Sequence, residues 1–334
     1  MLSAPLAPSL AEKTYLDEWG VKHQRLMGPG QNRIILIGGS SVAFGIDSER
    51  LERAMHRETL NAGLHAGLGL RLVLNEITDG ARSGDLIVLV PEYEHFYGET
   101  VDGQITAGEL IQRDWSAIRY VSTLGQWRNV LKAIPVLTST NLFAWIDLSK
   151  TILFGRDRSA PDRTSVYAGD SFDGHGDMVA HLNRLRKPDS VAAGFQPIDG
   201  EFNPATIDAI VQCGAELRVR GASLVIVYPA TALGYWTINH EKARRVANRL
   251  PLGWTRGGPE EWVFPDELFY DTPYHLTRAG RERRTDQLIR VLQAGVPTIS
   301  TTLSDPQLSD RCSASFIQCM YRGRLMRNRP VKIS

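Results

Sequence analysis

The sequence has few cysteines, no long apolar run and almost no net charge. Its three cysteines are scattered and form no Cys-x-x-Cys pair, which excludes a disulfide framework and a zinc site of that kind. Nowhere do about 18 apolar residues follow one another, so we expect no stable membrane span. With 38 basic and 37 acidic residues, the chain lacks the basic excess of nucleic-acid-binding proteins. We therefore expect no nucleic-acid partner and a small or neutral substrate.

The N-terminal stretch MLSAPLAPSLAEKTYLDEWG also lacks the features of a secretory signal. It has neither a basic n-region nor a continuous apolar h-region. This favours a cytoplasmic protein. If the native N-terminus lies upstream of Met1, a periplasmic or cell-envelope location is the alternative.

Four short apolar runs are spaced as in an α/β fold. They comprise residues 33–39, 59–63, 85–91 and 223–229. Their continuous Ile, Leu and Val residues suit strands that are covered on both faces by helices. Helical patterns fall between or after these runs, at residues 48–57, 68–82, 204–220 and 278–294. The order predicts an α/β fold with a doubly wound parallel sheet.

The regular spacing is interrupted between the third and fourth runs. Residues 99–199 carry aromatic and aliphatic side chains at mostly helical intervals, followed by a polar run with several glycines. We interpret them as a mainly helical insertion that either extends the core or forms a lid or partner surface. The α/β domain then comprises residues 30–98 and 200–296, and residues 297–334 are predicted to be an irregular tail.

The first apolar run leads into two glycines and two serines, residues 38–41. Such a turn lies at the carboxyl edge of a parallel sheet, where open α/β sheets hold their sites. A P-loop is excluded because five residues separate Gly39 from Gly45 and no lysine follows, and the pattern Gly-x-Gly-x-x-Gly is absent. We expect no cofactor here. Either a serine caps the next helix, or a serine is activated as a nucleophile.

An activated serine needs a base to take its proton, usually a histidine that is oriented by a carboxylate. The stretch FYDTPYHLTRAG supplies Asp271 and His275 in a loop before the last predicted helix. Pro273 keeps Thr272 extended and stiffens this loop. We expect His275 to face Ser41.

Three stretches in this order resemble the SGNH (GDSL-like) hydrolase superfamily, which has a flavodoxin-like sheet. They are GGSSVAFG (38–45), NAGLHAG (61–67) and DTPYHLTRAG (271–280). The first resembles the nucleophile block Gly-Asp-Ser, with Ser40 in place of the aspartate, and this implies that Ser41 is the nucleophile. The third resembles the histidine block.

The resemblance also implies an oxyanion hole, formed by the amides of Ser41 and Gly63. The family's third block contributes an asparagine amide, but the stretch PEYE (91–94) has Tyr93 at that position. Loss of one such donor lowers the rate on the order of a hundred- to a thousand-fold. Either Tyr93 or another group replaces the asparagine, or activity is low or lost.

Further residues are expected near the serine. Glu94 and His95 follow the third strand at the same sheet edge and, with Ser40, are expected to line the substrate pocket. Asp271 precedes His275 by four residues, whereas the family has three. It therefore either orients the imidazole or is an ordinary turn residue, which leaves a Ser-His dyad or another carboxylate as alternatives.

The resemblance implies a serine esterase or O-acyltransferase that acts on acyl esters through an acyl-serine intermediate. Envelope-polymer acyltransferases and thioesterases related to the superfamily also have Gly-Ser-Ser at the nucleophile, which favours an ester of a small molecule or a cell-surface saccharide. The alternative is a degenerate member of the fold that binds an acylated saccharide or a protein partner without turnover.

Two groups of residues outside these blocks admit more than one interpretation. The first lacks metal-site spacing and is interpreted as a solvated polar loop rather than a substrate or metal site: Asp170, Asp173, His175, Asp177 and His181. The second is expected in the core rather than as sugar-stacking platforms: Trp115, Trp127, Phe143 and Trp145. No metal site is expected.

Overall fold

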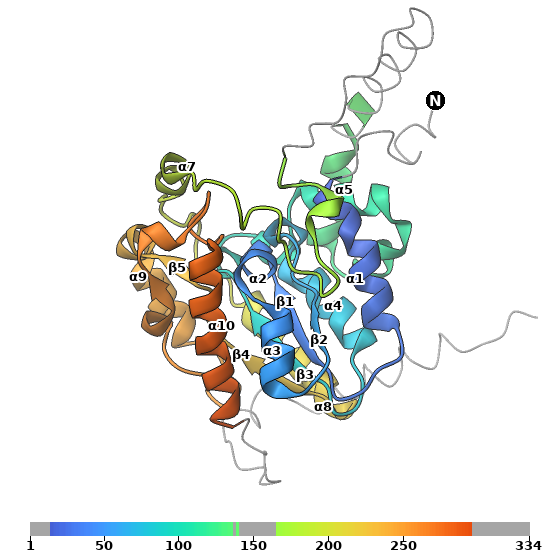
Figure 1. The fold of residues 1–334 in the computed structure, drawn as a ribbon. Coiled ribbons are helices and arrows are strands. Elements are labelled where there is room, and N and C mark those ends of the chain that lie inside the picture. The colour runs from blue at the N-terminus through green and yellow to red at the C-terminus, as the bar shows by residue number, and fades with distance from the viewer. Residues whose placement is uncertain (1–13, 136–137, 140–164, 296–334) are drawn as a thin grey trace, which may run out of the picture. The chain divides into compact units, whose positions relative to one another are not determined.

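The computed structural model describes residues 14–135, 138–139 and 165–295. Its main feature is a four-stranded parallel sheet in the order β2-β1-β3-β4, flanked by helices (Figure 1). The strands are β1 (Ile34–Gly38), β2 (Thr59–Asn61), β3 (Leu86–Val90) and β4 (Ser223–Ile226). They coincide with the four predicted apolar runs, so the α/β fold is confirmed.

The strands form because their apolar residues are covered from both sides. Every residue of β1 and β3 is buried. Ile35 pairs with Ile87, which in turn pairs with Leu224 on β4. Full burial of each such side chain contributes about 1.5–3 kcal/mol, so the register that places them inside is strongly favoured.

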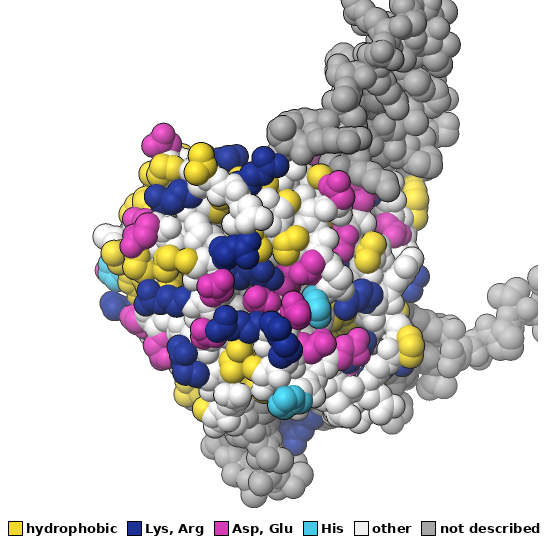
Figure 2. Space-filling view, viewed as in Figure 1, with side chains coloured by type: hydrophobic (Ala, Val, Ile, Leu, Met, Phe, Trp, Pro, Cys, Tyr) yellow, Lys and Arg dark blue, Asp and Glu magenta, His cyan; other side chains and the backbone are white. Residues whose placement is uncertain are grey.

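Two groups of helices pack on the sheet. The helices are α1 (Glu18–Met27), α2 (Ser40–Gly45), α3 (Ser48–Met55), α4 (Leu70–Gly80), α5 (Ile105–Arg113), α7 (Pro188–Ala193), α8 (Ala205–Val219), α9 (Leu233–Ala247) and α10 (Arg278–Gln293). α4 packs against α1 and α8, whereas α10 packs against α2 and α3. Figure 1 shows α3 and α10 side by side in front of the sheet. Figure 2 shows basic and acidic side chains interspersed over this same face, in keeping with the balanced charge of the chain.

A short second sheet follows the main one. It pairs β5 (Thr231–Ala232) with β6 (Val263–Phe264) in parallel, and α9 lies between them along the chain. The loop that carries His275 comes after β6 and leads directly into α10.

The first part of the predicted insertion extends the core. Leu64, Leu68 and Leu72 pack in one buried cluster with side chains from α5 and the 3-10 turn that follows it, among them Leu110 and Tyr120. The described residues up to Gly295 belong to one compact unit. The buried cluster joins the beginning of the insertion to the loop after β2.

The expectation that the insertion's aromatic residues lie in the core is wrong for two of them. Trp115 is 45% exposed and Trp127 is 40% exposed. Phe143, Trp145 and the predicted tail at 297–334 lie outside the described residues.

Candidate active site

The turn between β1 and α2 is the centre of the candidate site. A Cβ at Gly38 would lie 2.4 Å from the backbone oxygen of Val90, and a Cβ at Gly39 would lie 2.5 Å from Oε1 of Glu92. Only glycine fits at Gly38, and a side chain at Gly39 would displace the carboxylate of Glu92, because the turn packs directly against the end of β3 and the residues after it. This close packing presents Ser40 at the carboxyl edge of the parallel sheet, where α/β folds hold their sites.

Three side chains form a hydrogen-bonded chain at this edge. Nε2 of His275 lies 2.8 Å from Oγ of Ser40, and Nδ1 of His275 lies 2.8 Å from Oδ1 of Asp271. His275 is 5% exposed and Asp271 is 8% exposed, whereas Ser40 is partly open to solvent. A hydroxyl, an imidazole and a carboxylate in this order are the arrangement that activates a serine.

The loop explains how Asp271 reaches His275 across four residues. The amide of Tyr270 donates to the carbonyl of His275 at 2.7 Å and closes the loop. Inside it, Oγ1 of Thr272 accepts from the amides of Tyr274 and His275. The chain therefore curls, and the carboxylate of Asp271 lies against the ring.

Two aromatic side chains fix the imidazole and the carboxylate. The ring of Phe44 stacks on His275 with centroids 3.9 Å apart and an interplanar angle of 6°. The hydroxyl of Tyr167 donates to Oδ2 of Asp271 at 2.7 Å. Burial opposes ionisation of Asp271, but the hydrogen bonds from His275 and Tyr167 outweigh it, so the pKa of Asp271 lies below its usual value. The carboxylate is thus held in its charged form.

The serine that faces His275 is Ser40, and not Ser41 as the sequence led us to expect. Successive residues at the start of a helix point about 100° apart, so only one of them can face the imidazole. Ser41 is fully buried, and its hydroxyl has no hydrogen-bond partner among the described residues. Its amide donates to Oε1 of Glu92 at 3.0 Å. Ser41 therefore belongs to the inner side of the turn.

The donors expected for an oxyanion hole are engaged elsewhere. The amide of Gly63 donates to the side-chain oxygen of Asn61 at 3.0 Å, and the amide of Ser41 is bonded to Glu92. The hydroxyl of Tyr93 is buried, and burial raises the pKa of Tyr93 well above its usual value. None of these groups offers an accessible donor to an oxygen at Ser40.

Two other amides flank the turn. A Cβ at Gly39 would lie 3.0 Å from the backbone nitrogen of Ala66, and the amide of Ser40 itself follows Gly39 along the chain. Within the described ranges, neither N–H donates to a protein acceptor. The loop is fixed beside them, because Nδ1 of His65 accepts from the amide of Gly67 at 2.8 Å. Sequence reasoning missed Ala66, since nothing in its residue type marks a free amide.

Glu94 and His95 lie close to the site, in its supporting layer. The carboxylate of Glu94 accepts from the hydroxyls of Tyr235 and Tyr274, and burial raises the pKa of Glu94 above its usual value. Nε2 of His95 lies 3.1 Å from the carbonyl of Ala66, and burial lowers the pKa of His95. Glu94 thereby holds the residue before His275, and His95 holds the loop at Ala66. Their predicted contact with substrate stays a prediction.

A buried cation offsets the charge of Glu92 at the turn. Arg284 is fully buried over the ring of Trp262, with 5.7 Å between the guanidinium carbon and the ring centroid. Burial lowers the pKa of Arg284 to about 9, and the negative charge of Glu92 opposes that shift. The charges of Arg284 and Glu92 therefore attract each other, although among the described residues the guanidinium nitrogens of Arg284 make no hydrogen bond.

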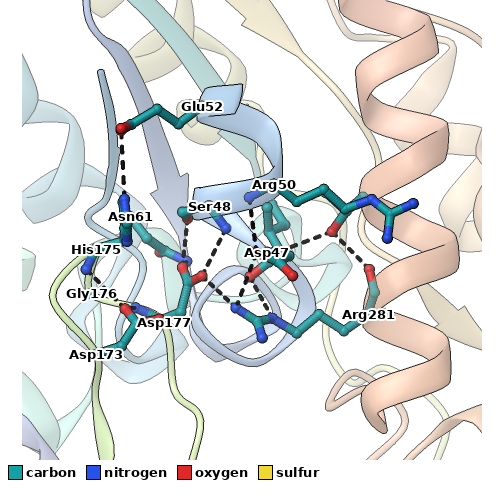
Figure 3. Close-up of polar contacts among 12 residues, drawn as sticks. Asp47, Ser48, Arg50, Glu52, Asn61, Asp173, His175, Gly176, Asp177 and Arg281 are labelled. Carbon is teal, nitrogen blue, oxygen red and sulfur yellow. Dashed lines mark hydrogen bonds and ion pairs between the residues drawn. The ribbon is translucent and has the colours of Figure 1, made fainter. Parts of the chain in front are cut away.

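A polar network behind the turn fixes the loop after β2 (Figure 3). The carboxylate of Asp177 accepts from the amide and hydroxyl of Ser48, from Nδ2 of Asn61 at 2.7 Å and from Arg281 at 2.5 Å. Because Oδ1 of Asn61 also accepts from the amide of Gly63, the network reaches the predicted oxyanion block. It joins α3, β2 and α10.

The interpretation of Asp177 and His181 as members of a solvated loop is wrong. Asp177 is 0% exposed and His181 is 1% exposed, whereas Asp170 is exposed. Nε2 of His181 lies 2.9 Å from the carbonyl of Leu276, and burial lowers the pKa of His181 to about 4. Both residues support the candidate site, because their long-range partners lie in the elements that carry it.

Lys22 of α1 supports the same loop from the other side. Its ammonium group donates to the carbonyls of Asn61 at 2.9 Å, Gly63 at 2.7 Å and Gly176 at 2.6 Å. Burial lowers the pKa of Lys22 to about 8, although Glu18 opposes the shift. A lysine in this role has no signature in the sequence.

Other kinds of site find little support. In the part of the chain that the structure describes, no group of three or more His, Cys, Asp or Glu residues is placed to hold a metal ion. None of the described helices is both long and apolar enough to cross a membrane. Comparison with known proteins finds no matching family model and no matching curated protein. The geometry at Ser40 therefore carries the functional argument.

Proposed function

We propose that this chain is a serine esterase or O-acyltransferase in which Ser40 is the nucleophile. The observation that carries the proposal is the chain of hydrogen bonds from Ser40 through His275 to Asp271. The partly open hydroxyl at its end lies at the sheet edge where a substrate can approach. The resemblance of residues 271–280 to the histidine block of SGNH hydrolases adds support from the sequence, although the same resemblance implied Ser41 rather than Ser40 as the nucleophile.

In the acylation step, Oγ of Ser40 attacks the ester carbonyl while Nε2 of His275 takes the hydroxyl proton. Asp271 accepts from Nδ1, which fixes the tautomer and stabilises the imidazolium that forms. The imidazolium then gives its proton to the departing alkoxide, so that an alcohol leaves and an acyl-serine remains. Stacking by Phe44 keeps the ring in place throughout.

The negative oxygen of the tetrahedral intermediate needs donors that are already in place. The amides of Ser40 and Ala66 donate to no acceptor among the described residues and flank Gly39, so we assign the oxyanion hole to them. This replaces the expected amides of Ser41 and Gly63, which other groups already occupy.

In the second step, water or a sugar hydroxyl attacks the acyl-serine, and His275 takes the attacking proton and returns it to Oγ of Ser40. Hydrolase and transferase share this intermediate and differ in the acceptor that the pocket admits. An ester of a cell-surface saccharide as substrate rests on the family resemblance alone.

The second candidate function is binding without turnover, and one observation favours it. The carboxylate of Glu92 lies beside Gly39, so its negative charge would oppose an oxyanion at Ser40. The buried Arg284 offsets this charge. Catalysis requires that Arg284 compensate enough of the charge of Glu92 for an oxyanion to form at Ser40; binding without turnover does not.

The test compares two adjacent serines. With p-nitrophenyl acetate as substrate, Ser40→Ala should lower turnover by about 10³-fold or more, because the nucleophile is lost. Ser41→Ala is the matched control and should keep turnover within about tenfold. Absence of turnover in the intact protein, or equal rates in Ser40→Ala and the intact protein, would favour the binding function.

A further inference from the structure

The helix at residues 124–135 exposes its apolar side. Four large apolar residues, here called the apolar stripe, recur at helical spacing and face solvent. They are Leu124 (88% exposed), Trp127 (40%), Leu131 (60%) and Ile134 (38%). A helix of a globular domain ordinarily buries such a stripe, so this pattern requires an explanation.

The inverted orientation is fixed by polar contacts on the buried side. Oε1 of Gln126 accepts from the amides of Ser122 at 2.8 Å and Thr123 at 3.2 Å. Nδ2 of Asn129 donates to the carbonyl of Gly103 at 2.8 Å. Rotation of the helix to bury the stripe would break the bond from Asn129 to Gly103 and leave that buried amide without a partner, whereas the bonds of Gln126 stay within residues 122–126.

Small residues at the helix contact reinforce this orientation. Ala133 is fully buried, and a Cβ at Gly108 of α5 would lie only 2.4 Å from the Cβ of Ala133. The two helices therefore approach closely on the side opposite the stripe. The apolar residues are held outward by packing as well as by hydrogen bonds.

The helix that carries the stripe and the turn before it have charge of one sign, although Glu99 and Asp102 of a neighbouring segment lie beside Leu124 and Arg128. Residues 115–135 contain three bases, Arg119, Arg128 and Lys132, and no acidic residue, although the whole chain is balanced. Arg128 and Lys132 lie on the exposed side of the helix. Arg128 also pairs with Glu99, so Lys132 contributes most of the uncompensated charge.

We propose that the apolar stripe docks on an anionic phospholipid surface, with Leu124, Trp127 and Leu131 inserted among the lipids. An interfacial helix combines apolar and tryptophan side chains with lysine and arginine in this way. The bases then face lipid phosphates. A twofold contact with a second copy of the chain would instead bring the bases of both copies together, which disfavours it.

The experiment measures sedimentation of the full chain with two kinds of vesicle, phosphatidylcholine alone and an equal mixture with phosphatidylglycerol. We expect binding to the mixed vesicles and weaker binding to the neutral ones. The double variant Leu124→Ser with Leu131→Ser should weaken binding about tenfold or more, because two inserted side chains are lost. Leu252→Ser is the matched control, because Leu252 is 86% exposed and lies outside the stripe.

The charge arm uses Lys132→Ala. Loss of one base near an anionic surface should weaken binding to the mixed vesicles about fivefold and leave binding to neutral vesicles unchanged. Absence of binding to either vesicle, or equal binding by the double variant and the intact chain, would overturn the proposal. So would a dimer in solution that the double variant converts to a monomer, since a second copy would then be the occupant.

Discussion

Buried polar groups have different roles at the sheet edge near Ser40 and in the helix at residues 124–135. At the sheet edge, the buried His275 and Asp271 converge on the hydroxyl of the partly exposed Ser40. In the helix, the buried amide of Gln126 accepts from the amides and hydroxyls of Ser122 and Thr123, while the other side presents leucines and a tryptophan to solvent.

The difference shows which property to expect from each region. Buried titratable groups that meet at a partly exposed hydroxyl indicate chemistry, whereas outward apolar residues on a helix that is anchored by polar contacts indicate binding. The two should therefore separate in experiment. Leu124→Ser with Leu131→Ser should weaken vesicle binding without changing turnover of a soluble ester, and substitutions near Ser40 should do the reverse.

The largest effect expected among the supporting residues is that of Asp271→Asn. An amide would favour the wrong tautomer of His275 and could not stabilise the imidazolium, so kcat should fall by about 10³- to 10⁴-fold. Circular dichroism checks the fold, and vesicle binding should be unchanged. Tyr167→Phe is the control, since it removes a hydrogen bond to Asp271 but keeps the carboxylate. A mild Asp271→Asn phenotype beside an inactive His275→Ala would reduce the triad to a dyad.

Ala66→Pro tests the oxyanion donor, because proline has no backbone N–H and adds only a small ring at this position. Ala66 is the first residue of the 3-10 helix Ala66–Leu68, where proline is tolerated, and His65 has the extended conformation that a following proline requires (φ −140°, ψ 129°). We expect kcat to fall about 10²- to 10³-fold with little change in KM. Ala66→Gly keeps the amide and should stay near the parent rate. Equal rates for the proline and glycine variants would contradict the assignment of Ala66.

The smallest expected effect is a change in stability with pH, which tests whether His181 is buried or solvated. Burial lowers the pKa of His181 to about 4, so between pH 6.5 and 4 the unfolded chain binds a proton that the folded chain does not. The free energy of unfolding should therefore fall by about 2 to 3 kcal/mol more in the parent than in His181→Gln from pH 7 to pH 4. Urea titration at both pH values measures the difference. An equal fall in the free energy of unfolding for the parent and His181→Gln would indicate that His181 is solvated.

The four strands were predictable because both of their faces are buried, which leaves continuous apolar runs in the sequence. The histidine loop was predictable for a different reason. Pro273 and the polar residues around it mark a turn directly before a helical pattern. The choice between Ser40 and Ser41 was not, because it depends on the rotational phase of α2 against His275, and both serines fit the same pattern.

The roles of Asp177, Lys22 and Ala66 could not be derived from the sequence. Each depends on partners that are far away along the chain, such as the carbonyl of Gly176 for Lys22. The prediction that Trp127 of the helix at 124–135 is buried was wrong for another reason. The periodicity of this helix defines an apolar side but not which side is buried, and here the polar side provides the anchors.

Covalent labelling followed by peptide mapping tests the central claim most directly. A fluorophosphonate reacts with an activated serine by attack of Oγ on phosphorus and loss of fluoride, and mass spectrometry of the fragmented peptide locates the adduct among residues 38–45. The account predicts a single adduct on Ser40, abolished by His275→Ala and retained in Ser41→Ala. An adduct on Ser41, or no adduct on the intact protein, would contradict it.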